Sequence, residues 1–197
     1  MPVFPGDPPV ELAPAGAVPP WQVTRLRLGT HSGTHIDAAS HYVPGGRTID
    51  EYPLERFVLD AYVAHLEAVP GAAISWEDIA AQLPSDLTGV GVLLHTGWDR
   101  YWGSGQAQDH PYLSEGAASR LAACGATLLG TDALNVDATA RGTIHAHAAL
   151  LGADVLIVEN LTGLDALAAG RSYRCAFVPL KVAGGDGSPI RAYAQMD

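Results

Sequence analysis

Three histidines and an aspartate stand within eleven residues of one another: His31, His35, Asp37 and His41. Neutral imidazole and carboxylate together form a ligand set that suits zinc, manganese or iron better than calcium or magnesium. A short segment that supplies three ligands leaves coordination positions open, as a catalytic metal requires and a closed structural site does not. The alternative, polar side chains on a solvated loop, is the usual one for a lone histidine. For this cluster we predict a catalytic metal.

The spacing of these four residues restricts the backbone that carries them. All four residue numbers are odd, and side chains alternate between the two faces of a strand, so an extended strand would point all four side chains to one face. A straight strand would spread them over roughly 33 Å, too far to share one ion. An α-helix would place the first pair and the last pair on different faces. We therefore expect an extended segment with a sharp bend, and Gly33 is the expected flexible point.

Apolar patterns predict the strands around this segment. Residues 22–28 alternate apolar and polar side chains and predict a half-buried strand that leads into the histidine cluster. Continuous apolar runs predict buried strands, and the run at 155–158 ends directly before Glu159. The remaining strands are expected at 57–66, 91–95, 126–130, 173–182 and 190–194.

Three helices are expected between the strands. One spans 75–83, and one is capped by Ser114 and ends near Cys124, with Gly125 following it. The third is capped by Thr143 and carries His145 and His147. Strands of both kinds, interleaved with three helices, indicate an α/β domain of mixed strand order. No Gly-x-Gly-x-x-Gly occurs to suggest a dinucleotide-binding fold.

The spacing H-x-G-T-H-x-D-x-x-x-H, from His31 to His41, resembles the signature of the cyclase family, whose best-known members are bacterial kynurenine formamidase and isatin hydrolase. The resemblance covers nearly the whole chain, and its further blocks are residues 5–9, 44–50, 96–98, 130–132 and 150–161. It implies a single compact β/β/α, swivelling-domain-like fold over residues 1–197. Two departures stand out, a short N-terminus and Ala39 where the family commonly has proline.

The resemblance also implies roles for individual residues. His31, His35 and Asp37 would be metal ligands, and His41 the catalytic acid or base. A second metal, bridged by Asp37, would be held by a later histidine and a glutamate, which match His147 and Glu159; His145 is the alternative to His147. Isatin hydrolase-like members are taken to use one manganese, so one or two ions, zinc or manganese, remain open.

Glu159 has some support from the residues alone. It closes an apolar run, and a buried carboxylate needs a cation or hydrogen-bonding partners to stay charged. The alternative is a solvated position just past the end of the strand.

These ligands predict metal-assisted hydrolysis at a carbonyl, and the resemblance implies that the bond cleaved is a C–N amide bond. A bound metal lowers the pKa of its water to about 7 and polarises a carbonyl, and a histidine such as His41 can move the proton to the leaving nitrogen. The expected substrate is an aryl formamide such as N-formylkynurenine, or a cyclic amide. Two alternatives stay open: a metal-dependent cyclase or lactonase of natural-product metabolism, and a catalytically silent binding protein. The chain has no Gly-x-Ser-x-Gly, which argues against a serine hydrolase.

Several residues are candidates for substrate binding. Four aromatic residues could form a wall of the binding site against which an aromatic substrate ring packs: Phe4, Trp21, Trp98 and Trp102. Asp132, followed by Asn135 and Asp137, comes after a predicted strand and would contact substrate or hold a metal ligand in place. The alternative is that these aromatic residues fill the core or an interface, and that the polar ones stabilise turns.

Composition narrows the partners and the location. The net charge of −10, from 21 acidic and 11 basic residues, argues against nucleic acid and anionic membranes as partners. Two cysteines are too few for a disulfide framework, and no signal peptide or membrane span is apparent. We therefore expect a cytoplasmic enzyme that acts on a small-molecule substrate. Seven prolines make residues 1–20 a non-helical segment that lies on the surface or reaches a partner subunit. The resemblance implies a homodimer or higher oligomer.

Overall fold

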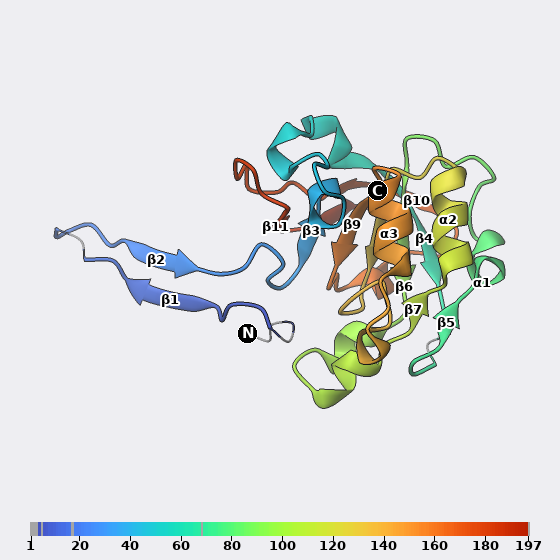
Figure 1. Ribbon diagram of the computed structural model, residues 1–197, viewed down its shortest axis with the longest axis horizontal. Helices are drawn as coiled ribbons and strands as arrows, with labels where there is room; N and C mark the ends of the chain where they lie inside the picture. The colour runs from blue at the N-terminus through green and yellow to red at the C-terminus, as the bar shows by residue number, and fades with distance from the viewer. Residues whose placement is uncertain (1–3, 5, 17, 68, 197) are drawn as a thin grey trace.

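An eight-stranded sheet forms the centre of the computed structural model, which describes residues 4, 6–16, 18–67 and 69–196 (Figure 1). Four parallel strands make its middle: β4 (Val58–His65), β6 (Gly91–His95), β8 (Leu128–Thr131) and β9 (Leu156–Glu159). Antiparallel strands extend both sides: β3 (His35–Asp37), β11 (Gly187–Pro189), β10 (Ser172–Ala176) and β12 (Tyr193–Gln195). The order is β11-β3-β9-β8-β6-β4-β10-β12, and the expected mixed α/β fold is confirmed.

The sheet separates two hydrophobic cores. Three helices cover one face (Figure 1): α1 (Trp76–Ala80), α2 (Glu115–Ala123) and α3 (His145–Gly152). Successive strand residues alternate between the cores, so Ile157 packs on the helix side while Leu156 and Val158 pack on the other side. This explains why the central strands are continuously apolar: both of their faces are buried. Near the helices, β5 (Ala73–Ile74) and β7 (Tyr112–Leu113) form a separate parallel pair.

Most predicted elements appear with shifted ends. Strand β6 matches its prediction, and α2 has the expected Ser114 cap, with Gly125 in a left-handed conformation after it. Helix α1 is shorter than predicted. The strand predicted over 173–182 ends at Ala176, and three residues later Pro179, which has no N–H, forms only an isolated bridge. Strand β9 includes Glu159 as its last residue, so this carboxylate is buried and not solvated.

The prediction that Thr143 caps α3 is wrong. Ile144 occupies the cap position without a side-chain bond, because the Thr143 hydroxyl is engaged with Ala138 and Asp137. The Asp137 carboxylate instead accepts hydrogen bonds from the first-turn amides of Ala146 and His147, at 3.0 and 2.9 Å. An acid from the preceding loop therefore fixes the start of the helix that carries His147.

The predicted half-buried strand at 22–28 is also corrected. Strand β2 (Thr24–Arg27) pairs antiparallel with β1 (Glu11–Pro14), and the hairpin projects from the body of the molecule (Figure 1). All four residues of β2 are exposed, because the alternating apolar face finds no partner within the described chain. We call residues 11–27 the arm. Within the described residues, no helix has both the length and the apolar character that a membrane crossing demands.

Candidate metal centre

The bend predicted in the histidine segment is present. Gly33 has a φ of +68°, β3 extends over His35–Asp37, and a 3-10 turn over Ala39–His41 carries His41 back toward the strand. Because β3 lies antiparallel to β9, His35 stands directly opposite Glu159. Opposite residues of an antiparallel pair share one face, which explains how the two side chains meet across 124 positions of sequence.

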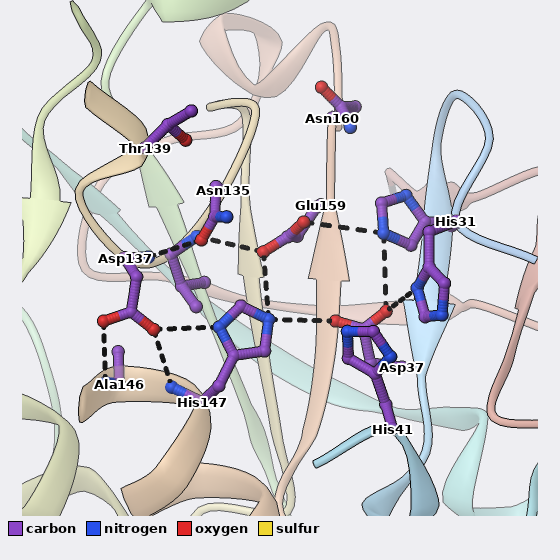
Figure 2. A network of polar contacts seen from close by, with 12 residues as sticks. His31, Asp37, His41, Asn135, Asp137, Thr139, Ala146, His147, Glu159 and Asn160 are labelled. Carbon is purple, nitrogen blue, oxygen red and sulfur yellow. Dashed lines mark hydrogen bonds and ion pairs between the residues drawn. The ribbon is translucent and has the colours of Figure 1, made fainter. Parts of the chain in front are cut away.

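Three imidazoles and two carboxylates converge at this point (Figure 2). The Nδ1 atom of His31 lies 2.7 Å from Asp37 Oδ1. His35 Nε2 lies 3.4 Å from Asp37 Oδ1 and 3.5 Å from Glu159 Oε2. His147 Nε2 lies 3.6 Å from Asp37 Oδ2 and 3.7 Å from Glu159 Oε1. We call these five residues the cluster.

Each imidazole of the cluster is held from behind by an acceptor on its other nitrogen. His35 Nδ1 lies 2.8 Å from the Gly33 carbonyl oxygen, and His147 Nδ1 lies 2.8 Å from Asp137 Oδ2. His31 Nε2 lies 3.1 Å from Asp186 Oδ2. Such outer acceptors fix the tautomer and ring orientation of metal-binding histidines, so this arrangement fits the pattern of a metal site.

The charges of the cluster explain its titration. Burial lowers the pKa of His31, but the bonds and charges of Asp37 and Asp186 outweigh it and raise that pKa to about 9. Burial also lowers the pKa of His147, but hydrogen bonds to Asp137 and Asp37 and the charges of Asp37 and Glu159 outweigh that effect and raise it to about 10. Positive charge is therefore strongly favoured at this site, whether protons or a metal ion supply it.

The donor set fits a divalent transition ion. Asp37 is fully buried, and its Oδ2 atom has no hydrogen-bond partner among the described residues. A buried carboxylate oxygen without a partner is costly unless a cation faces it. Ligand atoms of His31, His35 and Asp37 lie close enough to one another to hold one ion, and so do those of Asp37, His41 and His147. Imidazole and carboxylate oxygen suit zinc and manganese.

The structure places His147 in the cluster and His41 beside it, and leaves His145 outside. The ring of His41 lies against that of His31, with centroids 3.9 Å apart, and 5.7 Å from the ring of His147. His145 Nε2 instead lies 2.9 Å from the Leu113 carbonyl oxygen, beside β7. Burial lowers the pKa of His41, and the positive charges of His31 and His147 add to that effect against the carboxylates.

A cavity of about 380 Å³ adjoins the cluster, and His31, His35, His147 and Glu159 are among the residues that line it. Large apolar side chains supply much of its wall: Phe4, Tyr42, Trp102, Leu134 and Ile144. Asn135 and Thr139 add polar groups, and His41 also lines the cavity.

The other substrate-binding candidates lie outside this cavity in the described chain. Trp21 stands on the arm, 73% exposed. Trp98 is buried and packs against Tyr101, with ring centroids 4.7 Å apart. Asp132 is buried beneath the loop after β6, where it accepts hydrogen bonds from Thr96 and Gly97.

One residue at the site was missed in the sequence analysis. Asp186 lies 155 positions from His31 and reaches it only because β11 pairs with β3. The one hint was the glycine on either side of it, which suggests a tight loop but does not indicate what the loop approaches.

Comparison with known proteins gives consistent results. A family model described as "Putative cyclase" matches residues 1–138. The kynurenine formamidase of Paracidovorax citrulli is 34% identical over 97% of this chain and 89% of its own length, and that of Maricaulis maris is 34% identical over 98% and 90%.

Solved structures agree in fold. One described as a potential metal-dependent hydrolase with cyclase activity has a TM-score of 0.81 and 29% identity, covering 98% of this chain and 90% of that one. An isatin hydrolase bound to the product analogue thioisatinate has a TM-score of 0.86, with coverages of 98% and 86%; at 23% identity it supports the fold alone. The match over most of the chain confirms the resemblance seen in the motifs: the chain belongs to the cyclase family.

Proposed function

We propose that this protein is a metal-dependent hydrolase that cleaves the C–N bond of an aryl formamide, such as N-formylkynurenine, or of a cyclic amide. The observation that carries the proposal is the convergence of three imidazoles and two carboxylates beside a cavity lined by aromatic side chains, with one buried carboxylate oxygen, Asp37 Oδ2, that has no partner among the described residues. Relatives named as kynurenine formamidases, which match nearly the whole chain, support the same reaction class.

His31, His35 and Asp37 would hold one ion, and Asp37, His147 and Glu159 a second. A divalent ion there supplies a polarised carbonyl and water of lowered pKa. Zinc and manganese both suit the donors. The outer acceptors on all three imidazoles keep the metal-facing nitrogens unprotonated and aimed inward when the ion is bound.

His41 would move the proton. It lies beside the cluster at the edge of the cavity and is part of a 3-10 turn, so its ring is close to the reacting bond without belonging to the strand that carries the ligands. Its lowered pKa keeps it neutral near pH 7, and a neutral imidazole can accept a proton from attacking water and then donate it to the leaving nitrogen.

The cavity favours a flat aromatic substrate. Phe4, Tyr42 and Trp102 offer ring faces and edges, and the cavity volume of about 380 Å³ falls in the range that small-molecule sites occupy. The amide to be cleaved would lie beside the cluster, where Asn135 and Asn160 supply groups that can hydrogen-bond to it.

The decisive experiment pairs metal analysis with turnover. His35→Ala is expected to lose bound zinc or manganese and all activity, because it removes a buried ligand. His41→Ala is expected to keep the metal and lose about 100-fold or more in kcat, as removal of a general acid–base typically does. If His41→Ala turned over at the wild-type rate, the acid–base role would be wrong.

His145 and His147 form a matched pair on one helix. His147→Ala is expected to lower the metal content, whereas His145→Ala, two residues away and facing β7, is expected to keep it. Elemental analysis of both purified variants checks this.

A metal-dependent cyclase or lactonase is the second candidate. It is favoured by the solved structure described as having cyclase activity and by the ability of one site to serve carbonyl chemistry of either kind. Assays of N-formylkynurenine, isatin and simple lactones side by side distinguish the two. A metal-loaded protein that binds small aromatic acids and hydrolyses none of these would instead support a silent binding protein.

We also propose that the chain works as a homo-oligomer in the cytoplasm. The arm supports an oligomer, because an isolated two-stranded hairpin with exposed Leu12, Trp21 and Leu26 has little stability by itself. Both cysteines are free thiols, which is compatible with a reducing compartment.

A further inference from the structure

A single carboxylate lies against two of the histidines at the site. Asp186 Oδ2 is 3.1 Å from His31 Nε2 and 3.4 Å from His41 Nδ1. Its other oxygen, Oδ1, accepts a hydrogen bond from the Thr30 hydroxyl at 2.8 Å. One oxygen of Asp186 therefore contacts both a residue of the cluster and the residue beside it that would move the proton.

The backbone, rather than the side chain alone, places this carboxylate. Its loop is bound on three sides: the Asp186 carbonyl accepts from Ala38 N at 2.9 Å, the Gly185 carbonyl accepts from Ile49 N at 2.8 Å, and Gly184 N donates to Asp50 Oδ1 at 2.9 Å. Directly after it, β11 pairs with β3, the strand that carries the ligands. The loop is thus fixed to the same element as His35 and Asp37.

The contact determines which nitrogen of His41 is available. With Nδ1 facing Asp186, Nε2 is the nitrogen left for the reacting bond. The rings of His31 and His41 are tilted by only 35° and lie 3.9 Å apart, so the carboxylate that orients one ring also limits the other. Asp186 is therefore placed to act on His41 and His31 together.

We propose that Asp186 is a positioning residue that holds His41 with Nε2 toward the bond to be cleaved, and that it orients His31 through the same oxygen. The inference rests on the proposed function, because it takes His41 as the group that moves the proton. It adds a residue that lies outside the histidine motif and far from it in sequence.

The test is Asp186→Asn, which keeps the shape and removes the charge. We expect kcat to fall about 10- to 100-fold with KM within about twofold, as typically follows the loss of a carboxylate that orients a ligand or catalytic imidazole. Asp50→Asn is the matched control, since it makes the same change at a carboxylate that holds the same loop but contacts neither imidazole; its kcat is expected to stay within about twofold of wild type. Asp186→Glu, which restores the charge, is expected to be faster than Asp186→Asn.

Two further measurements separate positioning from folding. In a His41→Ala background, Asp186→Asn is expected to change kcat by less than about twofold, because its partner in proton transfer is already gone. Calorimetric titration of zinc or manganese into the metal-free variants gives a readout without turnover, and there Asp186→Asn is expected to bind about tenfold more weakly through His31.

The outcomes distinguish the two proposals. Wild type that binds metal but hydrolyses no member of the substrate panel overturns the proposed function. If wild type is active and Asp186→Asn has the same kcat, the positioning role of Asp186 is overturned while the proposed function stands. The same conclusion follows if Asp186→Asn lowers kcat by the same factor with and without His41. Should Asp186→Asn unfold, Asp186→Ser, which also removes the carboxylate, takes its place beside the Asp50→Asn control, and a kcat and metal affinity in Asp186→Ser equal to those of wild type overturn the positioning role.

Discussion

At the scale of single residues, the site depends on close approach as much as on ligand chemistry. Gly187 follows Asp186 at the start of β11, and a Cβ atom there would lie 2.7 Å from the Ile36 carbonyl oxygen and 2.8 Å from His31 Cε1. Neither distance is sterically tolerable. Glycine at this position lets the loop backbone lie flat against the imidazole, which is why His31 faces Asp37 and Asp186 at the same time.

We predict that Gly187→Ala displaces the ring of His31 and weakens metal binding about tenfold, with a loss of about 1–3 kcal/mol in stability from overpacking. Calorimetric titration and urea unfolding measure the two effects. Gly105→Ala is the control, because a Cβ atom there meets nothing within 4 Å. Unchanged metal affinity in Gly187→Ala would show that the close approach does not matter for the site.

At the scale of elements, the 3-10 turn that carries His41 is fastened to the rest of the molecule by Tyr52. The Tyr52 hydroxyl accepts from the Ala39 amide at 3.3 Å and donates to Asp154. The guanidinium groups of Arg47 and Arg56 lie over its ring, at 4.9 and 5.1 Å from the centroid. Proline, common in the family where this chain has Ala39, has no N–H to donate, so this anchor is available because the proline is absent.

Tyr52→Phe is therefore expected to cost about 1–3 kcal/mol in stability, since it leaves the buried Ala39 amide without its partner. We expect kcat to fall several-fold as the His41 turn loosens, with the metal content unchanged. Tyr173→Phe is the matched control: from β10 its hydroxyl accepts from the exposed Ala168 amide at 2.8 Å, and neither residue belongs to the cluster or lines its cavity. Equal kcat values for the two variants would contradict the anchoring role.

Asp154 gives this anchor a pH dependence. Burial raises its pKa, but hydrogen bonds from Tyr52 and Arg56 and the charges of Arg56 and Arg47 outweigh that effect and place it below the ordinary 3.8. The folded state therefore binds this proton less readily than the unfolded state. The stabilisation is complete above the unfolded pKa and is lost as the pH falls through the folded one.

Asp154→Asn, which suits the positive φ of this position, tests the effect. The difference in free energy of unfolding between wild type and variant is expected to be constant from about pH 7 to about pH 5 and to shrink below pH 3.8. Urea unfolding across this range measures it. A difference that stayed constant down to pH 3 would show that Asp154 keeps an ordinary pKa.

At the scale of the whole molecule, the arm carries apolar side chains that no other part of the described chain covers. In the hairpin Leu12 stands opposite Leu26, and both are more than half exposed, at 71% and 54%. Every other strand of the molecule is paired within the main sheet or in the short β5–β7 pair among the described residues. The arm begins shortly after Phe4 and Asp7, which line the cavity. Binding of the arm to a second copy of the chain would therefore place the dimer contact a few residues from the cavity lining.

If the arm makes the oligomer, replacing Leu12 and Leu26 together by serine should weaken self-association about 10- to 100-fold, because buried apolar anchors dominate such interfaces. Analytical ultracentrifugation over a range of concentrations measures this. Leu54→Ser serves as control, since Leu54 is 65% exposed on the body of the molecule. A wild-type protein that sediments as a monomer at all concentrations would refute the proposed oligomer.

The sequence by itself determined the features that depend on local chemistry and periodicity. Residue type and spacing identified His31, His35, Asp37 and His41 as a cluster, and apolar runs identified the central strands, because ligand preference and two-sided burial act on each residue wherever it lies. Family motifs added His147 and Glu159. The spacing of the four residues predicted a bend at Gly33, and the positive φ of that residue confirms it.

Tertiary structure alone decided everything that depends on which segments meet. Pairing of β11 with β3 brought Asp186 to two histidines, the loop before α3 brought Asp137 to the helix start in place of Thr143, and the lack of a packing partner left β2 exposed on the arm. No local pattern encodes these outcomes: Asp186 and His31 are 155 positions apart and meet through the sheet order, and whether Asp137 or Thr143 reaches the helix start, or β2 finds a packing partner, depends on how the loops and strands are placed in space. The sequence pattern indicates which chemistry a residue can take part in, and the tertiary structure determines which other residues it contacts.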